Sequence, residues 1–235
     1  ETVIQQIFWK EYILSCATEK EQNIQEEGTI KRVRLLIARV TDFVGHEDDI
    51  LKQIAPSYAR KYHEHKVKEE ACQELVSGYL LKRFLNVAVD DQIRIDEFGK
   101  PGLTDMTSYF NLTHSGEYAA LAISDCTVGI DLEKTLDYHE VTAAKVFTKE
   151  QQAVLKRLGD HCDGAAEQNR TYTRFWTQLE AKLKLYGVGF SGGWESIRDA
   201  DPCETVIQQI FWKEYILSCA TKEKVELCTE RVFYV

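Results

Sequence analysis

The segment TVGIDLEK, residues 127–134, alternates aliphatic and polar residues as a half-buried β-strand does. Asp131 and Glu133 would share one face of this strand, while the aliphatic side chains would pack into the core from the other. Gly129 would leave room beside the acids for a bulky ligand or for another stretch of backbone. Because two carboxylates held this close repel each other, they are either solvated where the strand runs into water or neutralised by a cation. The segment therefore predicts a core strand whose polar face is an exposed end or a cation site.

The segment RFWTQLEAKLKLYG, residues 174–187, is typical of an amphipathic helix. Glu180 and Lys184 stand one turn apart on the flank of its apolar stripe. Taken alone, they form an ordinary surface ion pair that stabilises a helix by about 0.3–0.5 kcal/mol. Placed near Asp131 and Glu133, however, a third carboxylate would complete an oxygen site for Mg²⁺, which leaves its remaining positions to substrate phosphates. This second interpretation predicts a phosphate-bearing substrate.

Two shorter segments contain groups that suit such a substrate. EFGKPGL, residues 97–103, places Lys100 in a turn, where a lysine can contact a phosphate as a point charge. NLTHSGE, residues 111–117, places Thr113, His114 and Ser115 at the end of a strand, where hydroxyl, imidazole and turn amide groups can bind phosphate oxygens. Each segment alone is also compatible with an ordinary turn.

Strand and helix patterns follow one another in two similar courses, before and after about residue 126. The second course contains a helix that starts with a capping residue, Thr148. The expected elements are a strand at 31–40, a helix at 67–86, a hairpin at 93–103, short strands between 109 and 134, helices at 148–159 and 174–187, and a loop at 159–170. This order predicts an α+β fold with two similar α/β subdomains, residues 31–126 and 127–235, after an N-terminal extension at 1–30.

Composition and charge limit the kinds of protein that this sequence can encode. The 235 residues are 44% hydrophobic, which is enough for a sizeable core, and 29 basic against 38 acidic residues give a net charge of −9. That charge argues against nucleic acid as a partner, and no apolar run approaches the ~20 residues of a membrane span. The seven cysteines are odd in number and contain no C-x-x-C pair, which fits a reducing compartment. We therefore expect a cytoplasmic protein that binds neither nucleic acid nor membrane.

In order, the motifs GKP, FNLTHSGE, VGIDLEK and FWT-x-x-EA-x-LK resemble those of the 4′-phosphopantetheinyl transferases, from about Lys31 to the C-terminus. The similarity is to the large monomeric type that activates peptide synthetases, and not to the small trimeric holo-acyl-carrier-protein synthase type. The resemblance implies two α/β subdomains related by a pseudo-twofold axis, with coenzyme A bound in the cleft between them. It also implies that the chain after the third helix ends in two antiparallel strands that close the second sheet.

The resemblance further implies the catalytic centre of such an enzyme. Asp131, Glu133 and Glu180 would hold Mg²⁺, or Mn²⁺ in its place, against the pyrophosphate of coenzyme A, the co-substrate. Lys184 would reach the same pyrophosphate, and Glu180 would be the base for the serine hydroxyl of an apo acyl or peptidyl carrier protein. The expected reaction transfers the 4′-phosphopantetheine group of coenzyme A to that serine and releases 3′,5′-adenosine bisphosphate. Asp131, Glu180 and Lys184 would thus be the catalytic residues.

Other matches to the family concern the phosphates and the carrier protein. Lys100, Thr113 and His114 match positions that contact the nucleotide phosphates of coenzyme A. Lys61 matches a further phosphate contact. The carrier protein is expected to dock on residues 135–147, whose apolar side chains suit a carrier helix.

Three residues depart from the family pattern. Leu179 stands where a lysine usually precedes the helix glutamate, and Gln73 and Glu74 stand where an arginine and a hydroxyl residue tend to lie near the adenosine phosphate. These departures keep open a coenzyme A-binding protein without transferase turnover. The acids alone keep open a Mg²⁺ phosphohydrolase that releases phosphate without a carrier.

The segment ETVIQQIFWKEYILSCAT occurs twice without change, at residues 1–18 and 204–221. The second copy matches the two closing strands of the family, whereas the first corresponds to nothing in it. Because old repeats diverge, an identical copy indicates a recent duplication, and we expect the first copy to have no part in the chemistry. The protein is expected to be a monomer unless the first copy pairs with a neighbouring molecule as a swapped strand.

Overall fold

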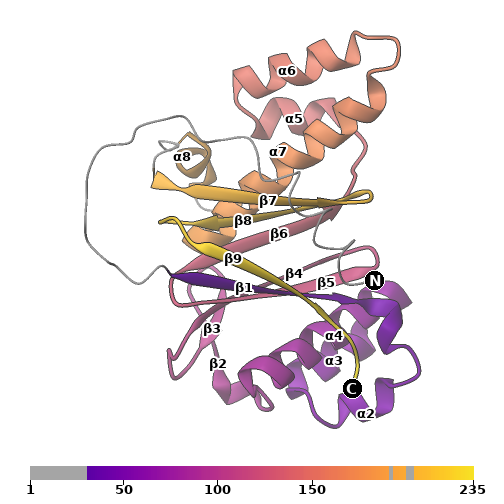
Figure 1. The fold of residues 1–235 in the computed structure, drawn as a ribbon, viewed down its shortest axis with the longest axis vertical. Helices are drawn as coiled ribbons and strands as arrows, with labels where there is room; N and C mark the ends of the chain where they lie inside the picture. The colour runs from indigo at the N-terminus through magenta and orange to yellow at the C-terminus, as the bar shows by residue number, and fades with distance from the viewer. Residues whose placement is uncertain (1–30, 191–192, 200–203) are drawn as a thin grey trace, which may run out of the picture.

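The computed structural model describes residues 31–190, 193–199 and 204–235, which form two main sheets with helices at both ends of the molecule (Figure 1). The elements are, in chain order, β1 (Arg32–Arg39), the 3₁₀ helix η1 (Val40–Phe43), α2 (Glu47–Leu51), α3 (Pro56–Glu64), α4 (Lys68–Leu85), the 3₁₀ helix η2 (Asp90–Gln92), β2 (Ile93–Ile95), β3 (Pro101–Leu103), β4 (Tyr109–Ser115), β5 (Tyr118–Ser124), β6 (Val128–Lys134), α5 (Glu140–Val146), α6 (Lys149–Gly159), α7 (Ala165–Tyr186), α8 (Trp194–Asp199), β7 (Val206–Trp212), β8 (Tyr215–Thr221) and β9 (Glu226–Val232). The predicted α+β class is confirmed.

The strand expected at 31–40 is β1, and it is buried on both faces. Leu36 and Ala38 pack in a core that also contains α4, while Val33 and Leu35 face a second core that contains β6 and β8. β1 pairs antiparallel with β5 and parallel with β9, so it is an inner strand of the sheet with the order β4-β5-β1-β9. A strand covered on both faces needs apolar residues on both, which is why the alternation in this segment is incomplete.

The two halves of the chain share one strand order. In the first half, the leading strand β1 pairs with β5, and β5 pairs with β4. In the second half, the leading strand β6 pairs with β8, and β8 pairs with β7. A long helix, α4 in the first half and α7 in the second, packs against the sheet of its own half (Figure 1). The two similar α/β units predicted from the sequence are therefore present.

The last strand, β9, departs from the expected division at residues 127–235. It leaves the second half and runs parallel to β1 in the first sheet (Figure 1). The guanidinium of Arg34 binds the carboxylate of Glu230 across this pair, with Nε–Oε1 at 2.5 Å and Nη2–Oε2 at 2.9 Å. Without β9 the edge of β1 would expose unpaired backbone groups, so the crossover protects that edge. Residues 226–232 thus belong to the first sheet.

The helix expected to start at Thr148 is α6, and its cap is the predicted one. Thr148 Oγ1 accepts a hydrogen bond from the backbone of Gln151 at 3.3 Å, and the backbone of Thr148 donates to the Gln151 side chain at 3.1 Å. This reciprocal pair is a capping box, and it satisfies two backbone donors that a helix start leaves unpaired. The helix ends at Gly159, as expected.

The prediction of a loop at 159–170 is wrong for the last six of these residues, because α7 begins at Ala165. The polar residues of this stretch form the exposed first turns of the helix. The side-chain amide of Gln168 donates to the backbone oxygen of Leu155 in α6 at 3.0 Å. This bond ties α6 to the start of α7, a tertiary contact that the sequence pattern alone does not reveal.

The second copy of the duplicated segment forms β7 and β8, an antiparallel pair in which Trp212 lies opposite Tyr215. β8 is buried along its whole length and lies between β6 and β7. The predicted pair of closing strands is confirmed. The first copy and the linker after it, residues 1–30, lie outside the described residues.

The two main sheets meet where β4 and β6 lie side by side, although these strands belong to different sheets. Alternate side chains of β4 accept hydrogen bonds from alternate backbone N–H groups of β6. The pairs are Asn111 Oδ1 with Ile130 N at 2.8 Å, Thr113 Oγ1 with Leu132 N at 3.1 Å, and Ser115 Oγ with Lys134 N at 3.1 Å. We call these three side chains of β4 the polar seam. The seam satisfies the backbone donors on this edge of β6 and holds the two halves together.

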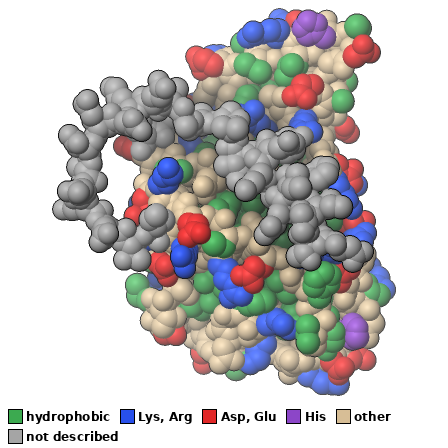
Figure 2. Space-filling model, viewed as in Figure 1, with side chains coloured by type: hydrophobic (Ala, Val, Ile, Leu, Met, Phe, Trp, Pro, Cys, Tyr) green, Lys and Arg blue, Asp and Glu red, His purple; other side chains and the backbone are tan. Residues whose placement is uncertain are grey.

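Acidic and basic side chains are interspersed on the face of the molecule shown in Figure 2. Charged side chains also pair across neighbouring strands, as Arg32 of β1 does with Glu226 of β9 at 2.8 Å. Exposed pairs of this kind contribute little to stability. Within the described ranges, no helix combines the length and the apolar character needed to cross a membrane.

Candidate active site

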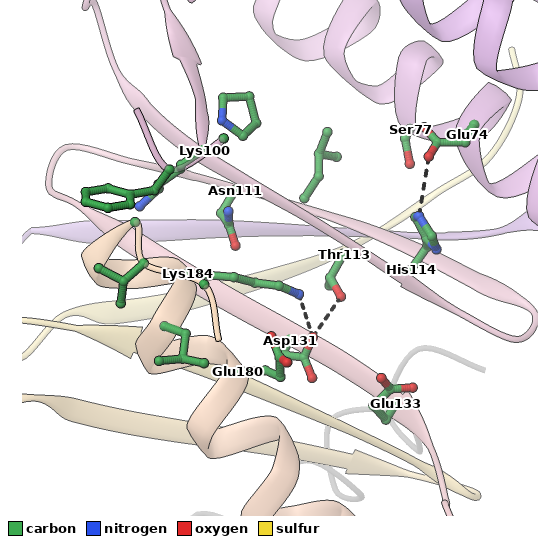
Figure 3. Close-up of a pocket in the computed structure, with 18 of the residues that line it drawn as sticks. Glu74, Ser77, Lys100, Asn111, Thr113, His114, Asp131, Glu133, Glu180 and Lys184 are labelled. Atoms are coloured by element: carbon green, nitrogen blue, oxygen red, sulfur yellow. Dashed lines mark hydrogen bonds and ion pairs between the residues drawn. The ribbon is translucent and has the colours of Figure 1, made fainter. Parts of the chain in front are cut away.

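All eight candidate site residues from the sequence line one cavity, which lies where the two halves meet (Figure 3). Its volume is about 560 Å³, and its walls come from α3, α4, the turn between β2 and β3, β4, β6 and α7. The eight residues are Lys61, Lys100, Thr113, His114, Asp131, Glu133, Glu180 and Lys184. Residues from both halves converge here because the polar seam places β4 directly beside β6.

Asp131 is the most buried charged group of the cavity, with 4% of its surface exposed. One carboxylate oxygen, Oδ1, lies 2.5 Å from Lys184 Nζ, and the Thr113 hydroxyl lies 3.5 Å away from the same atom. The other oxygen, Oδ2, is buried and has no hydrogen-bond partner among the residues that the structure describes. Burial raises the pKa of Asp131, although the ammonium of Lys184 opposes that effect. The orphaned oxygen is an unsatisfied acceptor, which one more positively polarised partner would satisfy.

Glu180 and Lys184 reach the cavity because α7 lies unusually close to β6. A side chain at Gly129 in β6 would overlap the backbone carbonyl of Ala181 and would come within 2.8 Å of the Cα atom of Leu185. Glycine is therefore required here for close approach of a helix. Of the two interpretations of Gly129, another backbone segment is the one that the structure shows.

Glu133 and Glu180 complete a group of three carboxylates in the cavity. Burial, followed by the charge of Asp131, raises the pKa of Glu133 to about 7, even though Ser115 Oγ donates to Glu133 Oε2 at 2.8 Å. Burial and the same Asp131 charge also raise the pKa of Glu180. All three acids thus resist ionisation together, and the alternative of a solvated strand end does not apply to this pair of residues on β6.

The donor set suits a hard divalent cation. Mg²⁺ and Mn²⁺ prefer oxygen ligands, and the orphaned oxygen of Asp131 together with two further carboxylates provides them. In residues 31–190, 193–199 and 204–235, however, no three His, Cys, Asp or Glu side chains stand grouped as a ready metal site. Figure 3 shows Glu133 farther along β6 than Asp131, and the ammonium of Lys184 supplies the neighbouring positive charge instead. The predicted ligands therefore share a cavity without forming a closed ligand group.

Lys100 lines the cavity, but its ammonium points at backbone carbonyls. Nζ donates to the backbone oxygen of Leu185 at 3.1 Å, near the end of α7, and to that of Val128 at 3.3 Å. Burial lowers the pKa of Lys100 to about 8. In this conformation Lys100 fastens the β2–β3 turn to the second half. Its ammonium has three N–H donors, so two of them bind these carbonyls and one is left for a phosphate contact.

Thr113 also has a structural partner on either side of its hydroxyl. It accepts a hydrogen bond from Leu132 N as part of the polar seam and lies next to Asp131. Ser115, two residues further along β4, repeats this arrangement. Its hydroxyl accepts a hydrogen bond from Lys134 N and donates one to Glu133. Each hydroxyl therefore joins the β6 backbone to a β6 carboxylate. The predicted phosphate contact of Thr113 would add a further partner to a hydroxyl that already has two.

Sequence reasoning named Ser115 only as a hydroxyl for phosphate oxygens, and it did not assign Asn111 to the site. The available signal was the spacing of polar residues two apart in NLTHS, which places them on one face of a strand. Gln73, one of the departures from the family pattern, is buried and donates to the backbone oxygen of Gly116 at 2.8 Å, so it supports the β4–β5 turn. Glu74, the next residue, lines the cavity.

We expect the protein without divalent cations to lose thermal stability as the pH rises from 5 to 7.5. The pKa of Glu133 is raised from 4.5 to about 7, so between these values the folded state holds a proton that the unfolded chain releases. Its contribution to stability is complete below about pH 4.5 and is lost as the pH rises toward 7. Scanning calorimetry in chelator should show a fall in melting temperature of roughly 5 °C.

The matched variant is Glu133→Gln, which cannot ionise. We expect it to lose about half of the pH dependence, because Asp131 and Glu180 also have raised pKa values and contribute the rest. An unchanged pH dependence in this variant would contradict the assignment to Glu133.

Comparison with known proteins agrees with this site. Residues 127–232 match the model of a family described as the 4′-phosphopantetheinyl transferase superfamily. The chain is 29% identical over 138 residues to 4′-phosphopantetheinyl transferase ffp of Bacillus subtilis, and 28% identical over 144 residues to 4′-phosphopantetheinyl transferase Sfp of Bacillus subtilis strain 168. The predicted resemblance to the 4′-phosphopantetheinyl transferase superfamily is confirmed over residues 127–232.

The aligned regions cover only part of each protein. They amount to 56% and 59% of this chain and to 58% and 62% of the two Bacillus relatives, respectively. A further relative, 4′-phosphopantetheinyl transferase AcpT of Salmonella typhi, is 36% identical over 99 residues, which is 39% of this chain and 47% of that protein. The chain thus spans about three fifths, or less, of the length of these curated relatives.

The superfamily match begins at β6 and ends at β9. It includes the three acids and Lys184, whereas Lys61, Lys100, Thr113 and His114 precede it. The carboxylate and lysine end of the cavity is therefore the part that this phosphopantetheinyl transferase family model covers.

Proposed function

We propose that the protein transfers the 4′-phosphopantetheine group of coenzyme A to a serine of an apo acyl or peptidyl carrier protein and releases 3′,5′-adenosine bisphosphate. The observation that carries this proposal is the pairing of Lys184 with Asp131, whose second oxygen is orphaned, beside two further acids in one cavity. A cavity of about 560 Å³ at the junction of the two halves suits a ligand as large as coenzyme A. Two similar halves within one chain support the large monomeric type of this superfamily.

Asp131, Glu133 and Glu180 are the residues that would hold Mg²⁺ or Mn²⁺. A cation held there supplies neutralisation of the pyrophosphate charge. The raised pKa values of the three acids support this assignment, because a nearby cation would relieve their mutual repulsion.

Lys184 binds the pyrophosphate as a point charge. Its side chain is 30% exposed, so it can turn from Asp131 toward a ligand without a change in α7. Charge develops on the pyrophosphate oxygens as the bond to the leaving group breaks, and a positioned ammonium stabilises that charge.

Glu180 takes the proton of the carrier serine. As that proton moves to the Glu180 carboxylate, the serine oxygen forms a bond to the β-phosphorus of coenzyme A. The bond from this phosphorus to the bridging pyrophosphate oxygen breaks, and 3′,5′-adenosine bisphosphate leaves with the electron pair. A base works best when its pKa is close to the working pH, and burial raises the pKa of Glu180 in that direction.

The proposed carrier site near residues 135–147 has less apolar surface than its sequence suggests. Ala143, Val146 and Phe147 are buried in the core around α7, which leaves Val141 as a strongly exposed apolar side chain of α5. Docking of the carrier on this segment therefore depends on its polar residues as well. The cysteines in the described part of the chain are free thiols, which supports a cytoplasmic location.

The alternative of a coenzyme A-binding protein without turnover was motivated by Leu179 and Glu74. Leu179 is buried among the apolar side chains of α5, α6 and α7 and does not line the cavity. Its identity therefore removes no group from the cavity. Glu74 does line the cavity, so it is the observation that favours this alternative.

The test uses purified full-length protein with coenzyme A, Mg²⁺ and a panel of apo carrier proteins from fatty acid, polyketide and peptide synthesis. We expect mass spectrometry to show one phosphopantetheine added to the carrier serine and stoichiometric release of 3′,5′-adenosine bisphosphate. Coenzyme A binding without modification of any carrier would favour the binding protein instead. Release of inorganic phosphate without a carrier would favour a phosphohydrolase.

A further inference from the structure

Glu74 of α4 stands at the centre of a basic cluster at one end of the cavity. Lys61 Nζ of α3 lies 3.1 Å from Glu74 Oε2. His114 Nε2 of β4 and His65 Nε2, just after α3, lie 3.8 Å and 3.9 Å from Glu74 Oε1. Three basic side chains from different parts of the first half thus surround one carboxylate. Figure 3 shows the Glu74–His114 pair apart from the Asp131–Lys184 pair, with Thr113 between them.

This carboxylate is more enclosed than its partners. The Glu74 side chain is 12% exposed, while those of Lys61, His65 and His114 are 49%, 35% and 38% exposed. Burial alone would raise the pKa of Glu74, but hydrogen bonds and charge from His114 and Lys61 outweigh burial and lower it. Glu74 is therefore ionised at neutral pH, and the basic cluster already holds an anion that the protein itself supplies.

The cavity consequently has two ends that differ in charge. At the Asp131–Lys184 end, the orphaned carboxylate oxygen is an acceptor that a further cation would satisfy. At the Glu74 end, the positive charge of Lys61 is matched by the carboxylate 3.1 Å away. A phosphomonoester entering this second end would approach Lys61 and His114, but it would also approach a buried like charge.

Coenzyme A has two separate anionic groups, the pyrophosphate and the 3′-phosphate. If the pyrophosphate lies at the Asp131–Lys184 end, as the proposed function requires, the 3′-phosphate is the group left for the Glu74 end. We propose that Glu74 is a specificity-determining residue that cancels the attraction of the basic cluster for the 3′-phosphate. The protein therefore binds coenzyme A and 3′-dephospho-coenzyme A with similar affinity.

The test is calorimetric binding of these two compounds, without a carrier protein, to the wild type, Glu74→Gln and the control Glu69→Gln. Glutamine keeps the shape of Glu74 and removes its charge, and the partners left behind are exposed enough to remain solvated. Glu69 lies on the same helix, is exposed and does not line the cavity, so the control makes the same change in net charge.

We expect the wild-type affinities for the two compounds to agree within about threefold. Glu74→Gln should increase the preference for coenzyme A at least about tenfold, because one negative charge near the 3′-phosphate is removed. The affinity of this variant for the dephospho compound should stay within about twofold of wild type, and the control should keep the wild-type ratio.

Two outcomes would overturn the inference, and they are distinct from a failure of the proposed function. A wild-type preference for coenzyme A above tenfold would show that Glu74 does not cancel the cluster, and this measurement needs no variant. An unchanged ratio in Glu74→Gln, with both compounds bound, would refute the role of Glu74 alone. Binding of neither compound to the wild type would refute the proposed function, and the inference would fall with it.

Discussion

Asp131→Asn is expected to reduce the proposed phosphopantetheine transfer by at least about a thousandfold, because it removes the carboxylate charge that pairs with Lys184 in the cavity. The carboxylate is the partner of Lys184 and contributes to the raised pKa values of Glu133 and Glu180. Asparagine has the same shape, but its NH₂ group would replace one of the two carboxylate oxygens, either Oδ1, which pairs with Lys184, or the orphaned Oδ2. The measurement is the rate of carrier modification under saturating coenzyme A and Mg²⁺.

The fold should survive this substitution. Asp131 is a buried charge whose pKa burial raises, so a neutral side chain relieves a desolvation cost while Lys184 turns to solvent. The matched control is Asp125→Asn, an exposed residue in the turn before the same strand, which should keep wild-type activity. Retention of more than a tenth of the activity in Asp131→Asn would contradict the assigned role.

Gly129→Ala is expected to destabilise the protein by about 3 kcal/mol and to remove most of its activity. The added methyl group would meet backbone atoms of Ala181 and Leu185, which cannot move aside as a flexible side chain can. Helix α7 would have to shift away from β6, and Glu180 and Lys184 would shift with it. Denaturant unfolding measures the loss of stability, and the transfer assay measures the loss of activity.

Gly102→Ala is the control for this second prediction. Gly102 also lies in a strand, and the closest atoms to an added methyl group belong to the Arg94 side chain at 3.5 Å, an ordinary contact. We expect the free energy of unfolding to change by less than about 0.5 kcal/mol. If Gly129→Ala were as stable as Gly102→Ala, the close packing of α7 on β6 would not be essential.

Local rules were enough to predict most individual elements. The strand β1, the helix α4 within one residue of each boundary, the hairpin of β2 and β3, and the capping box of α6 all follow from patterns a few residues long. They could be predicted because periodicity and capping act within one or two turns of chain. The start of α7 could not, because its first turns are polar and a contact with α6 accompanies them.

The candidate site also has a part that could be predicted from the sequence and a part that could not. The acids of VGIDLEK and the Glu180–Lys184 pair were predicted as one site, and the cavity brings them together. The direction of Lys100 toward the end of α7 was not predictable, because it depends on where a helix 85 positions away comes to rest. The use of the Thr113 hydroxyl in the polar seam likewise depends on β6 lying beside β4.

The sequence by itself determined the class of fold, the polar face of β6 and eight of the side chains that line the cavity. Each of these depends on the spacing of residue types along the chain, which can be read directly from the sequence. The tertiary structure alone decided that β9 returns to β1, that Gly129 admits a helix, and that Glu74 pairs with Lys61. The first two are contacts between segments far apart in the chain, and the third joins α3 to α4 within the first half. All three exist only once these elements have packed together.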